Sequence, residues 1–125
     1  IGTISLVVGG VGIMNTMLIV VNQRIREVGL RKAVGAKTNN ILMQFLVESA
    51  AISFFGGVFG IILGIIVSFI AAIVMQALKY NWPFLISWQS IVVATLVSIG
   101  IGVIFGMYPA RKASKISPME ALRYE

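Results

Sequence analysis

The chain has 125 residues, of which 58% are hydrophobic and only 11% are charged. Because a water-soluble domain usually carries about a quarter charged residues, this composition argues against a protein surrounded by water on all sides. The formal charge is +6, and with neither Cys nor His the sequence excludes disulfides, thiol nucleophiles, Cys/His zinc sites and His-based triads.

Three stretches contain no Asp, Glu, Lys or Arg: residues 1–23, 49–78 and 80–110, with lengths of 23, 30 and 31 residues. A membrane-spanning helix needs about 20 apolar residues to cross about 30 Å of hydrocarbon. We therefore predict an all-α integral membrane protein with three transmembrane helices, at about 1–21, 49–78 and 87–108. The chain begins with Ile inside the first apolar stretch, which lacks the basic leader of a secretory signal, so we expect a fragment of a longer polypeptide.

The basic residues gather in two segments. Five of the ten lie between the first two spans and four follow the third, whereas Lys79 alone lies between the second and third. Short loops rich in Lys and Arg stay in the cytoplasm, so residues 22–37 and the tail 109–125 are predicted to be cytoplasmic and residues 79–87 external. Nucleic acid is not an expected partner despite the charge, because the membrane spans would divide the cations.

The segment 22–37 has the pattern of a helix at a membrane surface. Ile25, Val28 and Leu30 alternate there with charged residues, which predicts a short helix lying along the cytoplasmic face of the bilayer. Gly35 is a natural end for it. The alternative is a loop whose cations only fix the topology.

One charge, Glu48, lies where the second span begins. A carboxylate at the bilayer centre costs about 2.5 to 3.5 kcal/mol, and residues 49–78 alone form about 45 Å of helix at 1.5 Å per residue. We therefore predict that residues 38–48 extend the second helix into the cytoplasm, with Glu48 near the membrane boundary. Its expected partners are basic residues of 24–37 or Gln44, one turn earlier.

Small residues recur every four positions in the second and third spans. The second span has Gly56, Gly60, Gly64 and Ser68, and the third has Ser98, Gly102, Gly106 and Ala110. Such a stripe lets two membrane helices pack closely. We expect these glycines to be helix-packing residues, with the partner helix in the same chain or in another.

The outer turn carries four aromatic residues near Pro83: Tyr80, Trp82, Phe84 and Trp88. Trp and Tyr favour the headgroup region, so these rings are expected to anchor the external ends of the second and third spans. The third span is expected to run from about Ser87, a candidate cap, to Tyr108, with Pro109 marking its exit.

The tail contains a helix-start signal. Ser117, Pro118 and Glu120 form a capping box with a proline at the first helical position. We predict a short amphipathic helix that begins at Pro118 on the cytoplasmic side. It either docks a partner or only ends the chain.

No chemistry is expected in this chain. GLRKAVGAKT at 29–38 invites comparison with a phosphate-binding loop, but Ala36 separates Gly35 from Lys37 and the segment before it is a membrane helix rather than a strand. The four carboxylates are too scattered to suggest a catalytic dyad. We expect no catalytic residue, no cofactor site and no metal site.

Three stretches together resemble a known family: GGVGIMNTML at 9–18, REVGLRKAVGAKTNNILMQFLVES at 26–49 and YPARKASKISPMEALRYE at 108–125. They are similar to the carboxy-terminal membrane region of FtsX-like permeases, especially the macrolide-exporter (MacB-type) branch of ABC transporters. In that family the region forms spans two to four, and a first span, a large extracytoplasmic domain and the ATP-hydrolysing domain lie elsewhere. Many members have an acid shortly before the second stretch, where this chain has Gln23.

The resemblance implies a mechanical role in a bacterial plasma or inner membrane. Family permeases work as dimers, each contacted inside the cell by a fused or separate nucleotide-binding domain that holds ATP and Mg, and a periplasmic adaptor is a further partner. ATP-driven motion would pass through the membrane helices to the extracytoplasmic side, for export or efflux of macrolide-like drugs, peptides or other substrates. The open alternatives are a permease of the lipoprotein-release or cell-division type, and a small membrane scaffold without an ATPase partner.

Two groups of residues match the family's cytoplasmic contacts by position. The ATPase-coupling group is Glu27, Gly29, Leu30, Arg31, Lys32, Ala33, Gly35 and Ala36. The group in the cytoplasmic tail is Arg111, Lys112, Ser117, Pro118, Glu120 and Leu122.

Overall fold

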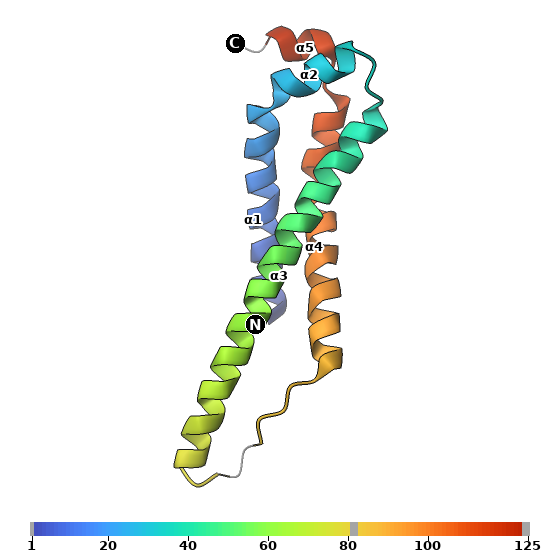
Figure 1. Ribbon diagram of the computed structural model, residues 1–125. Coiled ribbons are helices and arrows are strands. Elements are labelled where there is room, and N and C mark those ends of the chain that lie inside the picture. Colours follow the sequence, from blue (N-terminus) through green and yellow to red (C-terminus); the bar gives the residue numbers. More distant parts are fainter. Residues whose placement is uncertain (1, 81–82, 124–125) are drawn as a thin grey trace.

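The computed structural model describes the backbone of residues 2–80 and 83–123, and their side chains except those of residues 120, 122 and 123. Within these ranges the chain forms five helices and no strand (Figure 1). They are α1 (Gly2–Gln23), α2 (Ile25–Ala33), α3 (Thr38–Ala77), α4 (Trp88–Lys115) and α5 (Pro118–Arg123).

Three of the helices are long and apolar. Mean hydropathy reaches 2.2 in α1, 2.9 in α3 and 2.3 in α4, and each helix is long enough to cross a membrane. The short helices α2 and α5 lie side by side across one end of this bundle, while the α3–α4 turn lies at the other end (Figure 1). The fold is therefore the all-α membrane architecture predicted from the uncharged runs. We call the end formed by α2 and α5 the cation-rich end.

The boundaries differ from expectation at the third span. Pro109 does not end that helix, because α4 continues for six more residues to Lys115. A proline inside a helix removes the backbone hydrogen bond to the residue four positions earlier, here Phe105. Pro109 is fully buried. Ser87 is the residue that precedes α4, as expected, but its side chain makes no capping hydrogen bond.

The second long helix runs without a break from Thr38 to Ala77. Its 40 residues correspond to about 60 Å at 1.5 Å per residue, about twice the hydrocarbon thickness of a bilayer. The segment 38–48 is thus a direct helical continuation of the span. Gly35, which was expected to end the preceding helix, lies in the turn after α2 with a φ of +99°, a backbone conformation that glycine adopts most easily.

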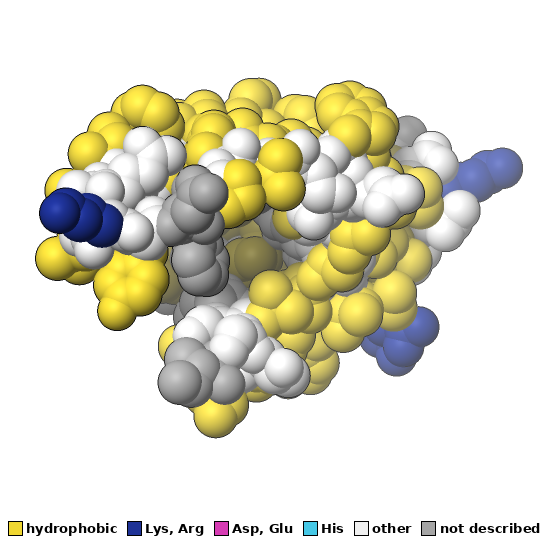
Figure 2. Space-filling view, turned by 90° about the horizontal axis from the view of Figure 1, so that it is seen from below, with side chains coloured by type: hydrophobic (Ala, Val, Ile, Leu, Met, Phe, Trp, Pro, Cys, Tyr) yellow, Lys and Arg dark blue, Asp and Glu magenta, His cyan; other side chains and the backbone are white. Residues whose placement is uncertain are grey.

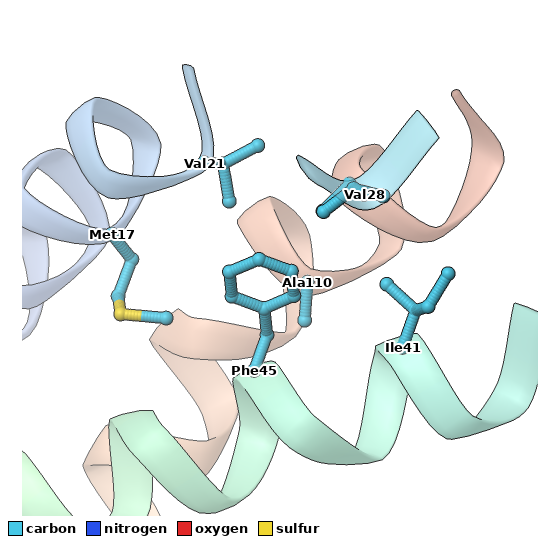
Figure 3. Packing of buried hydrophobic residues seen from close by; sticks show 7 residues of the cluster. Met17, Val21, Val28, Ile41, Phe45 and Ala110 are labelled. Atoms are coloured by element: carbon cyan, nitrogen blue, oxygen red, sulfur yellow. The ribbon is translucent and has the colours of Figure 1, made fainter. Parts of the chain in front are cut away.

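The buried core lies at the cation-rich end. Phe45 of α3 is only 2% exposed, and its ring lies among Met17 and Val21 of α1, Val28 of α2 and Ala110 of α4 (Figure 3). One cluster therefore joins four helices just where the two short helices cross the bundle.

A row of small residues joins α3 to α4. An added Cβ at Gly106 would collide with Ser49, one at Gly102 with Ser53, and one at Gly57 would lie 2.8 Å from the Ser98 hydroxyl. Ser98 Oγ also donates a hydrogen bond of 2.7 Å to the carbonyl oxygen of Ser53. Close approach at three successive turns makes α3 and α4 one antiparallel pair.

The other glycine stripe of α3 faces away from this pair. Gly56, Gly60 and Gly64 are exposed, and nothing lies within 4 Å of a Cβ added at any of them. The packed face of α3 is instead Ser49, Ser53 and Gly57, one residue out of register with that stripe. A contact of Gly56, Gly60 and Gly64 with a helix outside this chain stays a prediction.

The end opposite α2 and α5 is mostly hydrophobic (Figure 2), and Lys79 is the only Lys or Arg between residues 38 and 110. Tyr80 and Trp88 are exposed there, and the rings of Phe84 and Phe69 meet edge to face with centroids 5.6 Å apart. Trp82, expected to be an interface anchor, lies outside the described residues. The exposed rings suit the membrane interface.

Candidate functional site at the cation-rich end

Helix α2 has one face turned into the molecule. Ile25, Val28 and Gly29 are buried and Lys32 is half-buried. These positions follow the spacing i, i+3, i+4 and i+7, which places them on one side of a helix. The residues that pack α2 against the rest of the chain are therefore interspersed in sequence with residues that face solvent.

Gly29 is the contact point between α2 and α5. An added Cβ at Gly29 would collide with the Cβ of Ala121, whose side chain is fully buried. The carbonyl oxygen of Pro118 would lie 3.8 Å from the same Cβ. The two short helices are close enough here that only glycine fits without displacement.

Lys32 reaches from α2 to the end of α4. Its ammonium donates hydrogen bonds to the carbonyl oxygens of Ser114 and, at 2.9 Å, of Ile116. The last carbonyls of a helix have no partner within the helix, and a cation near them is favoured by the helix dipole. Lys32 thus caps the carboxyl end of α4 from a segment 82 residues away.

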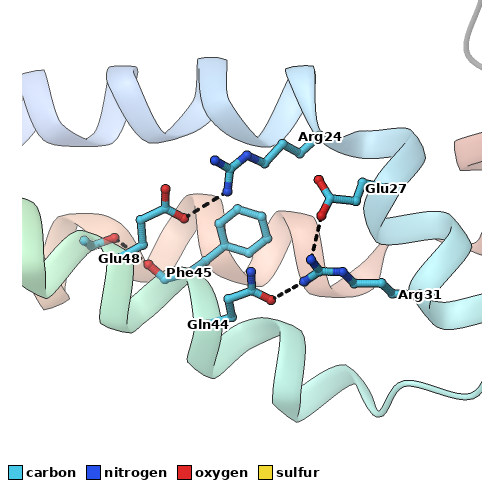
Figure 4. A network of polar contacts seen from close by, with 7 residues as sticks. Arg24, Glu27, Arg31, Gln44, Phe45 and Glu48 are labelled. Atoms are coloured by element: carbon cyan, nitrogen blue, oxygen red, sulfur yellow. Dashed lines mark hydrogen bonds and ion pairs between the residues drawn. The ribbon is translucent and has the colours of Figure 1, made fainter.

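A polar network connects α2 with the cytoplasmic extension predicted for α3 (Figure 4). Arg31 donates to Glu27 one turn earlier, at 2.6 Å, and to the side-chain oxygen of Gln44 at 2.7 Å. Arg24 pairs with Glu48 at 3.6 Å. The partner of Glu48 therefore comes from the basic segment 24–37, as expected, while Gln44 binds Arg31 instead.

The exposed side of α2 carries apolar residues as well as charged ones. Leu30 is 60% exposed and Val34 is 82% exposed, and Ala33 lies exposed between them. We call Leu30 and Ala33 of α2, together with Val34 directly after the helix, the α2 ridge, and all three are exposed. Met119 of the neighbouring α5 is 83% exposed.

The predicted coupling residues thus divide between the two faces. Gly29 and Lys32 turn inward, towards α5 and α4, and Glu27 and Arg31 pair with each other beside α3. Leu30, Ala33 and Gly35 are exposed, and Ala36 is half-buried beside the core. Val34 and Met119 were missed, although a helical-wheel reading of 25–34 places Val34 beside Leu30.

The predicted tail residues occupy the same end. Arg111 and Lys112 are exposed on the last turns of α4, Ser117 is exposed, and Pro118 begins α5 as expected. The side chains of Glu120 and Leu122 lie outside the described residues. Among the described residues there is no group of three or more His, Cys, Asp or Glu that could hold a metal.

These observations define a class of protein. It is an integral membrane protein in which three long apolar helices meet two short helices at a cation-rich end. A model of the FtsX-like permease C-terminal family matches residues 1–118. The chain therefore belongs to the FtsX-like permeases, a family of permeases and not of catalytic domains.

Curated relatives carry names of ABC transporter components. The chain is 50% identical over 122 residues to an uncharacterized ABC transporter permease, YknZ, of Bacillus subtilis, covering 98% of this chain and 30% of that protein. It is 50% identical over 125 residues to the macrolide export ATP-binding/permease protein MacB of Bdellovibrio bacteriovorus, covering all of this chain and 18% of that protein. It is 46% identical over 122 residues to a probable syringafactin export ATP-binding/permease protein, SyfD, of Pseudomonas syringae, covering 98% of this chain and 18% of that protein. The chain thus spans less than a third of the length of these relatives.

Proposed function

We propose that this chain carries ATP-driven motion from a cytoplasmic nucleotide-binding domain through the membrane to drive export. The observation that supports this most is the α2 ridge. Exposed apolar side chains gathered on one helix face mark an interaction surface more often than a free one, and this face lies beside exposed cations at one end of the bundle. Two relatives with this region are named as ATP-binding/permease proteins for export.

The partner at the ridge would be the nucleotide-binding domain, in the same polypeptide or in a separate one. ATP and Mg would bind in that domain and not in this chain. Leu30 and Val34 would enter an apolar pocket of the domain, and exposed cations such as Arg111 and Lys112 would flank them. With the cations on the cytoplasmic side, the chain would reside in a bacterial plasma or inner membrane.

A second copy of the permease is the partner we propose within the membrane. Gly56, Gly60 and Gly64 leave a small-residue stripe of α3 uncovered, and such stripes allow close helix contact. The mass of the full-length protein in lipid nanodiscs tests this, since a dimer is expected and a monomer would contradict it. A periplasmic adaptor would extend the export path, and macrolide-like drugs or peptides are the proposed substrates.

The ridge is tested with Leu30→Asp and Val34→Asp in the full-length transporter. A carboxylate placed in an apolar interface has to be desolvated, so we expect at least about a tenfold weaker association with the nucleotide-binding domain. Co-purification and ATP-dependent transport are the measurements. Leu85→Asp is the matched control, because Leu85 is 84% exposed at the other end. Full association and transport in both ridge variants would refute the proposal.

A further inference from the structure

Lys32 differs from the other cations at its end of the molecule. Arg26, Lys37, Lys112 and Lys115 are exposed, whereas Lys32 is half-buried and donates to the carbonyls of Ser114 and Ile116. The sequence explains why one of these carbonyls, that of Ser114, needs a donor from outside its own helix. The residue four positions after Ser114 is Pro118, which has no backbone N–H to offer, so the ammonium of Lys32 supplies the donor that a longer helix would have supplied.

The same face of α2 is fixed at a second point. Gly29, one turn before Lys32, lies against Ala121 of α5. Because α5 follows α4 after two residues, both contacts bind α2 to the carboxyl end of the same span. If α2 moves as a rigid body and both contacts are kept, the carboxyl end of α4 has to move with it.

The connection of α2 to α3 is less constraining, whereas α2 follows α1 after one residue, Arg24, whose backbone N–H and C=O are bonded to Val20 and Val28. Towards α3 the chain passes through residues 34–37, which include Gly35 with its φ of +99°. The polar link to α3, from Arg31 to Gln44, joins two exposed side chains, and exposed pairs contribute little. Between α2 and α4, by contrast, the link is the hydrogen bonding of the Lys32 ammonium to carbonyl oxygens at the end of α4.

We propose that Lys32 is a positioning residue that fastens α2 to the end of α4, so that α4 moves together with α2 when α2 is displaced. The contacts of Gly102 with Ser53 and of Gly106 with Ser49 then make α3 follow α4. This inference rests on the proposed function, in which the α2 ridge receives the push. It gives the push a route into α4 in addition to the short covalent link from α2 to α1.

The test uses the full transporter with its nucleotide-binding domains in lipid nanodiscs. Spin labels at Arg26→Cys in α2 and Tyr108→Cys in α4 report the distance between the two helices, after transport by the labelled protein has been verified. With Lys32 intact, the distance distribution should be narrow and the same without nucleotide and with a non-hydrolysable ATP analogue. A distance that changes when the analogue binds would overturn the proposal, and this measurement needs no change at Lys32.

Variants then distinguish the link between α2 and α4 from binding of the nucleotide-binding domain. Lys32→Met keeps the aliphatic stem but removes the charge, and should widen the distance distribution and lower transport per ATP hydrolysed by about fivefold or more. Binding of the nucleotide-binding domain and ATP hydrolysis should persist. Lys32→Arg, which can still donate to both carbonyls, should restore coupling. Lys115→Met removes the same charge from an exposed position and should leave coupling unchanged.

The outcomes also distinguish this inference from the proposed function. Normal transport in Lys32→Met, together with lost domain binding in Leu30→Asp, overturns the role of Lys32 alone. Retained domain binding in Leu30→Asp overturns the docking surface. Loss of domain binding in Lys32→Met would show that Lys32 acts in docking and would also overturn its role in fastening.

Discussion

Gly102 shows what a single residue contributes to this fold. A Cβ at this position would meet the side chain of Ser53 and would lie 2.9 Å from the backbone oxygen of Ser49. A side chain can rotate away, but a backbone atom moves only with its helix. Two residues earlier, Gly100 lies on the same helix with nothing within 4 Å of an added Cβ.

We predict opposite effects of alanine at these two glycines. Gly100→Ala should leave stability unchanged or raise it by about 0.5 to 1 kcal/mol, because alanine favours a helix. Gly102→Ala should force α3 and α4 apart and lower stability by about 1 to 3 kcal/mol. Thermal unfolding of the purified full-length protein in detergent measures both. Equal melting temperatures would show that the α3–α4 contact does not depend on this close approach.

At the scale of the element, α2 holds its place with small and charged residues and exposes apolar ones. Its buried face includes Gly29 and Lys32, whereas Leu30 and Val34 face solvent. A helix that only covered the core would have the reverse pattern. One side of α2 is thus packed within the chain, and the apolar residues on its other side are left exposed.

Enlarging Gly29 should therefore separate the two short helices. We predict that Gly29→Leu displaces α5 and increases backbone hydrogen exchange in 118–123 about tenfold or more, because the contact with Ala121 is lost. Ala33→Leu adds the same side chain to the exposed face and should leave exchange in that segment unchanged. Equal protection of α5 in both variants would mean that the Gly29 contact does not hold it.

The sequence predicted the positions of the helices better than it predicted which side of each helix packs against its neighbours. Long uncharged runs located α1, α3 and α4, and Pro118 located the start of α5, because length and backbone chemistry are local properties. Pro109 was expected to mark the exit of the third span, but the sequence did not show that α4 continues past it to Lys115, since burial of its ring depends on tertiary packing. Spacing alone also did not show that α3 packs through Gly57 rather than Gly56, or that Lys32 turns inward.

At the scale of the whole molecule, packing is concentrated where the charges are. Phe45 joins α1, α2, α3 and α4 at the cation-rich end, and the small-residue contacts tie α3 to α4 deeper in the bundle. The proposed function would account for this asymmetry, because a helix bundle pushed by an ATPase needs a firm connection at the end where the force enters. The account therefore depends on α2 and α5 both facing the cytoplasm.

Cysteine labelling in intact cells tests this central claim most directly. Val34 just after α2, Met119 of α5 and Leu85 between α3 and α4 are 82%, 83% and 84% exposed, so a difference in their labelling would report the side of the membrane and not burial. A membrane-impermeant maleimide should label Leu85→Cys in intact cells, and should label Val34→Cys and Met119→Cys only after the membrane is opened. Labelling of Val34→Cys or Met119→Cys from outside, or of the two from opposite sides, would contradict the account.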